Sequence, residues 1–198
     1  FKAEVEPIEY RVKRQMVPLE QDEGIRTETT TESLGKLRPA FSKEGILTAG
    51  NASPISDGAA ALVLASGAAV KAHGLKPIAK YNGGSWAAGA PYRFPEAPVP
   101  AVRRLLERTG GKIDEYDLFE NNEAFALNSV LFSEMLGVDP DRLNVHGGAV
   151  ALGHPIGCSG ARILVTLIHA LHTHDHTKGL AAICHGTGGG TSVALERV

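Results

Sequence analysis

Apolar and polar positions along the chain predict a series of short strands and longer helices. Residues 1–12 alternate loosely around Pro7, which predicts an edge strand interrupted by the proline. The polar stretch 21–42 predicts a loop, and the apolar run 59–65 predicts a buried strand followed by a short helix over 66–73. Beyond residue 76 the pattern is regular: strands are predicted at 77–85, 116–120, 143–146, 180–184 and 192–197, and helices between Pro98 and Gly110 and over 123–136 and 159–171.

Strands that alternate with helices and end in a hairpin indicate an α/β layered domain. The helix over 159–171 is apolar on nearly all sides, so we expect it to be buried. The chain has 198 residues, of which 43% are hydrophobic and 21% charged, so a packed core is expected. No internal repeat is visible.

Charge and cysteine content exclude several classes of protein. Lys and Arg number 20 against 22 for Asp and Glu, so the basic excess of a nucleic-acid-binding protein is missing. No apolar run is long enough to span a bilayer, so no membrane partner is expected. Two cysteines do not make a disulfide framework, which favours a reducing, cytoplasmic setting. The first residue is Phe1, so we expect that the natural chain starts elsewhere.

Three segments carry candidate chemistry because each follows a predicted strand. They are 121–125 (Asn-Asn-Glu-Ala-Phe), 147–155 (ending Gly-His-Pro) and 184–186 (Cys-His-Gly). Sites of α/β folds gather at strand ends. A cysteine and a histidine there can move a proton at sulfur, and an asparagine amide can hold a water or an oxyanion. Each feature alone has a plainer explanation, since a lone strand-end cysteine is usually a small buried hydrophobe and Gly-His-Pro is usually a turn.

Two other sequence patterns resemble ligand-binding sites, but each has a plainer structural explanation. Four histidines gather at the end of the predicted buried helix and could bind a metal: His169, His172, His174 and His176. A helix end exposed to solvent explains them better, so no metal is expected. The glycine-rich segment 186–190 lacks a following Gly-Lys-Ser/Thr and the third glycine of a dinucleotide motif. A tight hairpin turn beside the site explains it better.

Taken together the motifs resemble the thiolase family in sequence and order. The resemblance rests on Asn-Glu-Ala-Phe, the Gly-His-Pro segment with Ser-Gly-Ala-Arg after it, Cys-x-Gly near the C-terminus, and the earlier stretches 37–41 and 48–53. It covers essentially the whole chain and implies helices around a mixed five-stranded sheet, in the C-terminal half of a two-domain architecture. Residues 1–75 would hold the second part of the loop region and the last elements of the N-terminal domain, and residues 76–198 the C-terminal domain.

The resemblance implies a reversible Claisen condensation of acetyl-CoA with an acyl-CoA, in which a nucleophilic cysteine takes an acyl group and a second cysteine moves the α-proton. Cys184 matches the second, acid/base cysteine. His154 matches the histidine that activates the nucleophile and helps form the oxyanion hole, and Asn122 matches the asparagine that holds a water there. The nucleophile belongs to an N-terminal half absent from this sequence, and Cys158 occupies an ordinarily small structural position. We therefore expect this chain to be inactive without that half.

Substrate-binding positions follow from the same resemblance. Coenzyme A thioesters would be substrates, no cofactor is implied, and thiolases generally form dimers or tetramers, so a homo- or hetero-oligomer is expected. Phe94 lies where many acetyl-specific members have Met, and His185 stands where an aliphatic residue is common. The positions that match coenzyme A contacts or pocket walls are Arg26, Ser33, Ala40, Phe41, Ala49, Ser53, Ala124 and Phe125.

Two functions of other classes remain open from the sequence. A non-catalytic coenzyme A or acyl-CoA binding module could have kept the fold, although such a module needs none of Asn122, His154 and Cys184. A hydrolase could use cysteine and histidine from this chain alone, and it would release coenzyme A in a burst.

Overall fold

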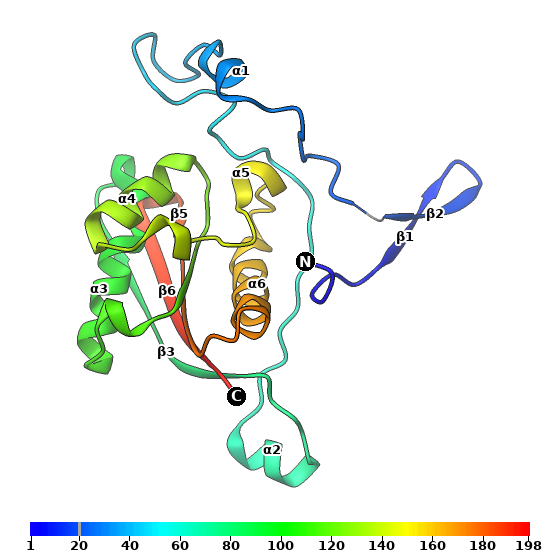
Figure 1. The fold of residues 1–198 in the computed structure, drawn as a ribbon, viewed down its shortest axis with the longest axis vertical. Coiled ribbons are helices and arrows are strands. Elements are labelled where there is room, and N and C mark those ends of the chain that lie inside the picture. The colour runs from blue at the N-terminus through cyan, green and yellow to red at the C-terminus, as the bar shows by residue number, and fades with distance from the viewer. Residues whose placement is uncertain (20) are drawn as a thin grey trace.

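The computed structural model describes residues 1–19 and 21–198, and a mixed sheet forms its centre (Figure 1). The strands follow the order β3–β6–β5–β4. β6 runs antiparallel to both of its neighbours, and β4 runs parallel to β5. The bounds are Ala79–Ala88 for β3, Leu118–Asn121 for β4, Lys178–His185 for β5 and Gly189–Arg197 for β6. The prediction of a mixed α/β sheet is confirmed.

The prediction of a fifth strand at 143–146 is wrong for the part of the chain that the structure describes, where the sheet has four strands. A single parallel bridge joins Leu143 to Phe119. The next residue, Asn144, has a positive φ of 50°. Its side chain accepts a hydrogen bond from the backbone N–H of Asn121 and donates one to the carbonyl of the same residue. This amide replaces the backbone pairing that would continue a fifth strand.

Helices cover both faces of the sheet and make three layers (Figure 1). α3 (Pro98–Thr109) and α4 (Ala126–Leu136) lie on one face, and α6 (Ser159–Thr173) lies on the other. The first cluster of buried side chains includes Val102, Leu105, Phe119, Phe132 and Leu180. The second includes Leu118, Ile163, Leu167, Leu171 and Leu195. Alternate residues of β4 and β5 thus enter different layers, as the pleat of a strand requires.

The helix ends agree with the sequence signals. Pro98 opens α3, where its missing N–H costs nothing, and Gly110 ends that helix with a φ of 69°. Gly137 ends α4 in the same left-handed conformation, with a φ of 71°. α6 is apolar and largely buried, as predicted. These three helices position the strand ends that carry the candidate chemistry.

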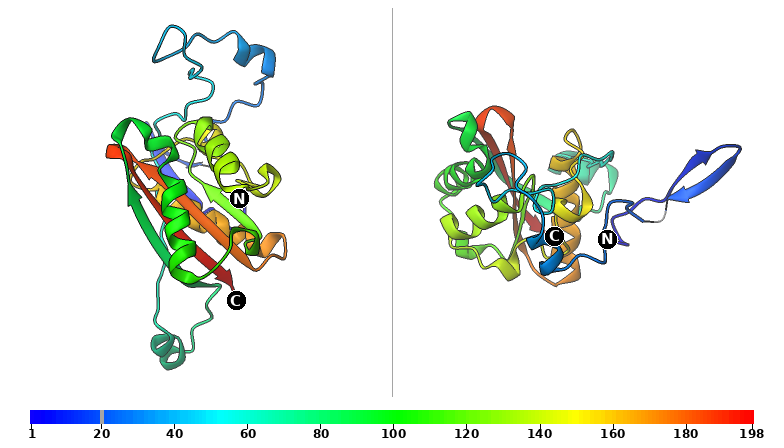
Figure 2. Two further views of the ribbon diagram at one scale, coloured as in Figure 1. Left: turned by 90° about the vertical axis from the view of Figure 1, so that its left-hand side faces the viewer. Right: turned by 90° about the horizontal axis from the view of Figure 1, so that it is seen from above.

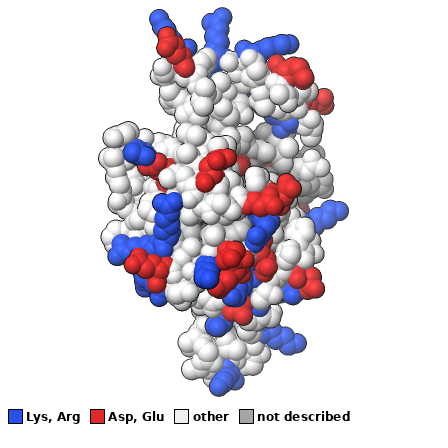
Figure 3. Space-filling view, turned by 60° about the vertical axis from the view of Figure 1, so that its left-hand side comes forward, with Lys and Arg blue, Asp and Glu red and all other residues white. Residues whose placement is uncertain are grey.

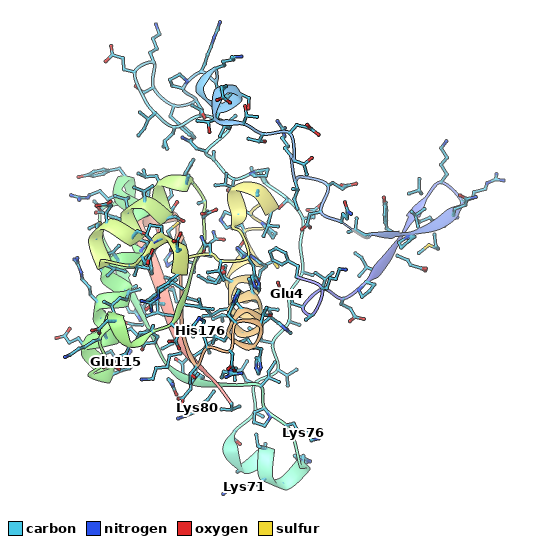
Figure 4. The ribbon with its side chains drawn as sticks, viewed as in Figure 1. Glu4, Lys71, Lys76, Lys80, Glu115 and His176 are labelled. Atoms are coloured by element: carbon cyan, nitrogen blue, oxygen red, sulfur yellow. The ribbon has the colours of Figure 1, made fainter. Side chains whose placement is uncertain are left out.

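The N-terminal segment lies outside the layered body (Figures 1 and 2). Residues 1–12 were predicted as one interrupted strand, but β1 (Ile8–Val12) pairs with β2 (Gln15–Leu19) in a protruding hairpin. The predicted loop contains a short helix, α1 (Thr31–Gly35). α2 (Gly67–His73) confirms the predicted short helix and lies at the opposite end, with Lys71 and Lys76 labelled there in Figure 4.

The expectation of a buried strand at 59–65 is also wrong. The segment is extended, but no ladder pairs it with another strand in the described parts of the chain. Leu62 packs against the α6 cluster, whereas Val63 is 96% exposed. A strand needs a neighbour for its backbone hydrogen bonds, and a hydrophobic run alone does not supply one.

The remaining elements are short. α5 (Ala149–Leu152) precedes His154, and single 3₁₀ turns complete the connections at Pro91–Glu96, Ile113–Glu115, Pro140–Arg142 and Gly186–Gly188. Acidic and basic side chains are interspersed on the face shown in Figure 3. Over residues 1–19 and 21–198, no helix is both long and apolar enough to cross a membrane.

Candidate active site

Asn122 and Cys184 lie at the same edge of the sheet because β4 and β5 are parallel neighbours. Asn121 pairs with Ala182, and the backbone N–H of Asn122 donates to the carbonyl of Ala182 at 2.9 Å. Cys184 follows two residues later near the end of β5. Asn122 is fully buried and Cys184 is 5% exposed. Backbone hydrogen bonds between the strands therefore hold both residues in place.

His154 reaches this edge from the turn after α5. Gly153 precedes it with a φ of 103°, a conformation that favours glycine, and a Cβ there would collide with Ser56. The backbone N–H of His154 donates to the carbonyl of Pro54 at 2.8 Å. Residues from the N-terminal segment thus hold the histidine backbone in place.

The His154 ring has a defined partner at each nitrogen. Its Nδ1 lies 2.7 Å from Oγ of Ser159, and that hydroxyl also donates to the carbonyl of Pro155 at 3.1 Å. Arg162 donates to Oδ1 of Asn122, so the Asn122 amide turns its N–H toward Nε2. Nε2 therefore carries the lone pair, and Nδ1 carries the hydrogen and donates to Ser159. Nε2 lies 3.4 Å from Nδ2 of Asn122. In this tautomer Nε2 can accept a proton, and the Asn122 side chain lies against it.

A buried carboxyl group and a guanidinium lie behind Asn122. Glu120 and Arg162 face each other at 3.5 Å, and Arg162 also lies 3.5 Å from Oδ1 of Asn122. Burial raises the pKa of Glu120 to about 8 despite the attraction of Arg162; Glu4, on the N-terminal segment (Figure 4), adds repulsion. Burial, and then the charge of Arg162, lowers the pKa of His154. His154 is therefore neutral near pH 7, as a base must be.

Cys184 and His154 both line a cavity of about 210 Å³. Its walls are mainly apolar, and they consist of Phe94, Ala124, His154, Ile156, Ile183, Cys184, His185 and Gly186. Asn122 does not line this cavity and reaches it through its contact with the His154 ring. The thiol and the imidazole therefore share one enclosed space of a size that suits a small acyl group.

Burial of Cys184 favours the neutral thiol, and two hydrogen bonds, from Asn128 and from the backbone at Cys184, favour the thiolate. Burial raises the pKa of the thiol. Nδ2 of Asn128, the third residue of α4, lies 3.3 Å from Sγ and opposes that rise. Both cysteines are free in the structure, and Cys158 lies at the start of α6, where burial also raises its pKa.

Glu123 joins its own Asn-Glu-Ala-Phe segment to the Gly-His-Pro segment. Its carboxylate accepts hydrogen bonds from Oγ of Ser129 at 2.9 Å and from the backbone N–H of Val150 at 3.4 Å. A Cβ at Gly148 would collide with this carboxylate. A larger residue at Gly148 would displace this carboxylate, at the point where the Gly-His-Pro segment approaches the Asn-Glu-Ala-Phe segment.

Four of the predicted substrate-binding residues meet beside the cavity. Both the backbone N–H and the hydroxyl of Ser53 donate to the carbonyl of Ala124 at 2.9 Å. Phe125 packs edge-on against Phe41 at 5.7 Å between ring centroids, and Phe94 lies 6.0 Å from it on the cavity side. The structure brings Phe41, Ser53, Ala124 and Phe125 together.

The other predicted substrate-binding residues lie away from the cavity lining. Arg26, Ser33, Ala40 and Ala49 are exposed in the segment around α1. The hydroxyl of Ser33 accepts from the backbone N–H of Thr30 and donates to its carbonyl, so it caps α1. Their role in binding coenzyme A stays a prediction.

The remaining histidines form no metal cluster in the described residues, where no group of three or more potential ligands is found. Nε2 of His146 and Nε2 of His174 lie 3.2 Å apart, which joins the loop before α5 to the end of α6. His185 lines the cavity mouth, but its side chain alternates with that of Cys184 along β5.

Sequence reasoning missed the residues that orient the candidate groups. Ser159 and Arg162 were noted only as parts of a motif, and Glu120 and Asn128 were not singled out. A usable signal was present for Asn128, because it follows the Asn-Glu-Ala-Phe segment by three residues at the start of a predicted helix. An asparagine at that position bonds backbone groups and faces the preceding loop.

Comparison with family models matches almost the whole chain. Residues 1–68 match the model described as thiolase, N-terminal domain, and residues 75–197 match the model described as thiolase, C-terminal domain. The domain boundary predicted between residues 75 and 76 stays a prediction.

Relatives and solved structures agree with the family models. The chain is 62% identical to an acetyl-CoA acetyltransferase of Synechocystis sp. and 46% identical to one of Escherichia coli, covering 100% of this chain and 50% of each relative. The crystal structure of the Bacillus anthracis acetyl-CoA acetyltransferase matches with a TM-score of 0.97 at 42% identity, over 100% of this chain and 50% of that one. Human mitochondrial 3-ketoacyl-CoA thiolase in complex with CoA matches with a TM-score of 0.87 at 37% identity, over 97% and 48%. The chain spans about half the length of these relatives, and it belongs to the thiolase family.

Proposed function

We propose that the chain supplies the acid/base half of a thiolase active site and acts in the reversible Claisen condensation of acetyl-CoA with a short acyl-CoA. The observation that carries this proposal is the shared cavity of Cys184 and His154, with Asn122 held against the imidazole. The similarity to proteins named acetyl-CoA acetyltransferase supports the reaction class. The chain covers half of those relatives, so the whole reaction is a proposal for the complete protein.

In this proposal His154 acts first. Its unprotonated Nε2 takes the proton of a nucleophilic cysteine that an N-terminal thiolase half supplies, and the sulfur attacks the acyl thioester. The bond between the acyl carbon and the sulfur of coenzyme A then breaks, and the departing thiolate takes the proton back from Nε2. With the proton bound, Nε2 becomes a donor toward the thioester oxygen, and Nδ2 of Asn122 lies beside it to hold a water or the oxygen itself. Ser159 keeps the ring in the required tautomer throughout.

Cys184 acts in the second half of the reaction. Its thiolate takes a proton from the methyl carbon of acetyl-CoA, and the resulting enolate attacks the acyl group on the other cysteine. The bond between that acyl carbon and the nucleophilic sulfur then breaks, and the proton held by Cys184 is available to the released thiolate. No cofactor enters these steps, because the coenzyme A thioesters are themselves the substrates.

Substrate binding is proposed for the segment that carries Phe41, Ser53, Ala124 and Phe125. The rings of Phe41 and Phe125 pack beside the cavity, and apolar walls of this kind suit a pantetheine arm. Arg26 is proposed to meet the nucleotide end, because a guanidinium binds phosphate well. Ser33, Ala40 and Ala49 would line the path between them, and the complete protein would be an oligomer.

The test is turnover by the complete protein that contains this chain together with the N-terminal half. We expect thiolysis of acetoacetyl-CoA by the parent, loss of turnover in Cys184→Ala, and turnover close to parental in the matched control Cys158→Ala. Calorimetric titration with acetyl-CoA accompanies the assay. Binding without turnover in the parent would favour the acyl-CoA binding module, and turnover in Cys184→Ala would refute the assignment of Cys184.

A further inference from the structure

We propose that Asn128 is a positioning residue for Cys184, whose side-chain N–H donates to Sγ and stabilises the thiolate. This inference rests on the proposed function of Cys184 and extends it to a residue of a different element. Cys184 lies near the end of β5 and Asn128 in the first turn of α4, so the contact joins residues 56 apart in sequence. Both side chains are buried, and their N···S distance is 3.3 Å.

The orientation of the Asn128 amide is fixed by two other hydrogen bonds. Its Oδ1 accepts from the backbone N–H of Phe125 at 2.9 Å, and its Nδ2 donates to the carbonyl of Pro95 at 2.9 Å. A flipped amide would place Oδ1 against the Pro95 carbonyl and the NH₂ group against the Phe125 N–H. Because both arrangements are repulsive, Nδ2 must face Pro95 and Sγ. The second N–H of this amide is therefore directed to the sulfur.

The backbone holds Asn128 itself in place. Its carbonyl accepts a hydrogen bond from Nδ2 of Asn121 at 3.0 Å, so the strand β4 and the helix α4 are joined at this residue. Asn128 is fully buried, so water does not compete for its donors. A donor that is already oriented costs no reorganisation when charge develops on the sulfur.

A thiolate at this position needs donors to offset its burial, and Asn128 supplies the larger of two such contacts, the other being a backbone hydrogen bond at Cys184 itself. The cavity that Cys184 lines contributes His154 and His185 as titratable groups, and its other walls are apolar or backbone. His154 is neutral near pH 7, as argued above. A hydrogen bond from a neutral N–H to a charged acceptor is stronger than one to a neutral acceptor, so Asn128 favours the thiolate over the thiol.

A purely structural role is the competing explanation, since Asn128 also caps the first turn of α4. Asn128→Asp separates the two roles. The carboxylate keeps the size of the side chain and still accepts from Phe125, but it presents oxygen instead of N–H to Pro95 and to Sγ. Asn128→Ala removes all three contacts. Ser192→Ala is the matched control, because Ser192 lies on the neighbouring strand β6 and its hydroxyl donates a buried hydrogen bond to the carbonyl of Ala101 in α3 without touching Cys184.

The experiment is a pH titration of thiolate absorbance in the full 198-residue chain carrying Cys158→Ala, so that Cys184 is the remaining thiol. Circular dichroism confirms folding of each variant. We expect the midpoint to rise by about one pH unit in Asn128→Ala and further in Asn128→Asp, and to stay in place in Ser192→Ala. If Asn128→Ala does not fold, Asn128→Leu takes its place, because leucine is of similar size and removes the donor without adding a charge.

An unchanged midpoint in folded Asn128→Asp would overturn the inference, as would an equal rise in Ser192→Ala. The titration needs no turnover, so its result is independent of whether Cys184 is the acid/base. Turnover of Cys184→Ala in the complete protein decides that question separately.

Discussion

Nδ1 of His154 and Oγ of Ser159 lie 2.7 Å apart, and this contact determines which ring nitrogen is free to accept a proton. Ser159 directs its own hydrogen to the carbonyl of Pro155, so it accepts from the imidazole. Both residues belong to one turn at the start of α6. The Gly-His-Pro and Ser-Gly-Ala-Arg motifs therefore act as one unit, in which the serine orients the histidine.

Ser159→Ala should lower kcat of the complete protein by about ten- to a hundredfold, because loss of the hydrogen bond frees the ring to adopt the other tautomer. KM should change little, since Ser159 lies behind the ring and outside the cavity lining. Steady-state kinetics with acetoacetyl-CoA measure both values. Ser192→Ala, which also removes a buried hydroxyl, should keep parental kcat; a parental kcat in Ser159→Ala would show that the tautomer is set by other contacts.

Glu120 makes folding stability depend on pH in an unusual direction. Its pKa is about 8 in the folded protein against an ordinary value of 4.5, so the folded state holds a proton that the unfolded chain releases. Stability from this group is present below pH 4.5 and falls as the pH rises to about 8. Glu120→Gln should remove this fall. Urea unfolding across the same pH range should show a smaller decrease in the unfolding free energy for the variant, and identical slopes would refute the assignment.

Gly148→Ala should destabilise the protein by about 1–3 kcal/mol, because the added methyl group collides with the Glu123 carboxylate that holds Ser129 and Val150. Gly160→Ala is the control: it lies in the first turn of α6, where a Cβ meets no atom within 4 Å, so stability should be equal or higher. Thermal or urea unfolding compares the two. Equal destabilisation would mean that the collision is not the cause.

Phe94→Ala should shift substrate preference toward longer acyl chains, since Phe94 is a wall of the cavity and packs on Phe125. Each further methylene that enters the enlarged space gains about 0.8 kcal/mol, so the ratio of kcat/KM for a six-carbon over a four-carbon 3-ketoacyl-CoA should rise by about tenfold. Tyr92→Ala, which alters an exposed ring on the same turn, is the control. An unchanged ratio in Phe94→Ala would place the acyl group elsewhere.

The sequence predicted which strand ends come together better than it predicted the strands at 143–146 and 59–65. Asn122 and Cys184 follow strands that are parallel neighbours, and strand ends of that kind meet at one edge, so their proximity follows from topology. The strand predicted at 143–146 failed because the side chain of Asn144 takes the backbone partners of Asn121, which no hydrophobic pattern reveals. The prediction of a strand at 59–65 was wrong because a strand needs a neighbouring strand for its backbone hydrogen bonds, and a hydrophobic pattern does not reveal whether one is present.

The orienting residues were missed for a related physical reason. Asn128 and Ser159 act through single hydrogen bonds between elements, at 3.3 Å to Sγ of Cys184 and 2.7 Å to Nδ1 of His154. Periodicity reports which face of a helix is buried, but it does not report which atom a buried polar group meets. Only the packed structure supplies these partners.

The most direct test of the account is deuterium exchange into the methyl group of acetyl-CoA in heavy water, catalysed by the complete protein. This exchange needs only removal and return of the α-proton, the step assigned to Cys184. Cys184→Ala should lower the exchange rate by about a hundred- to ten-thousandfold, while acetyl transfer between coenzyme A molecules continues through the other cysteine. Exchange at the parental rate in Cys184→Ala would contradict the assignment of Cys184 as the acid/base.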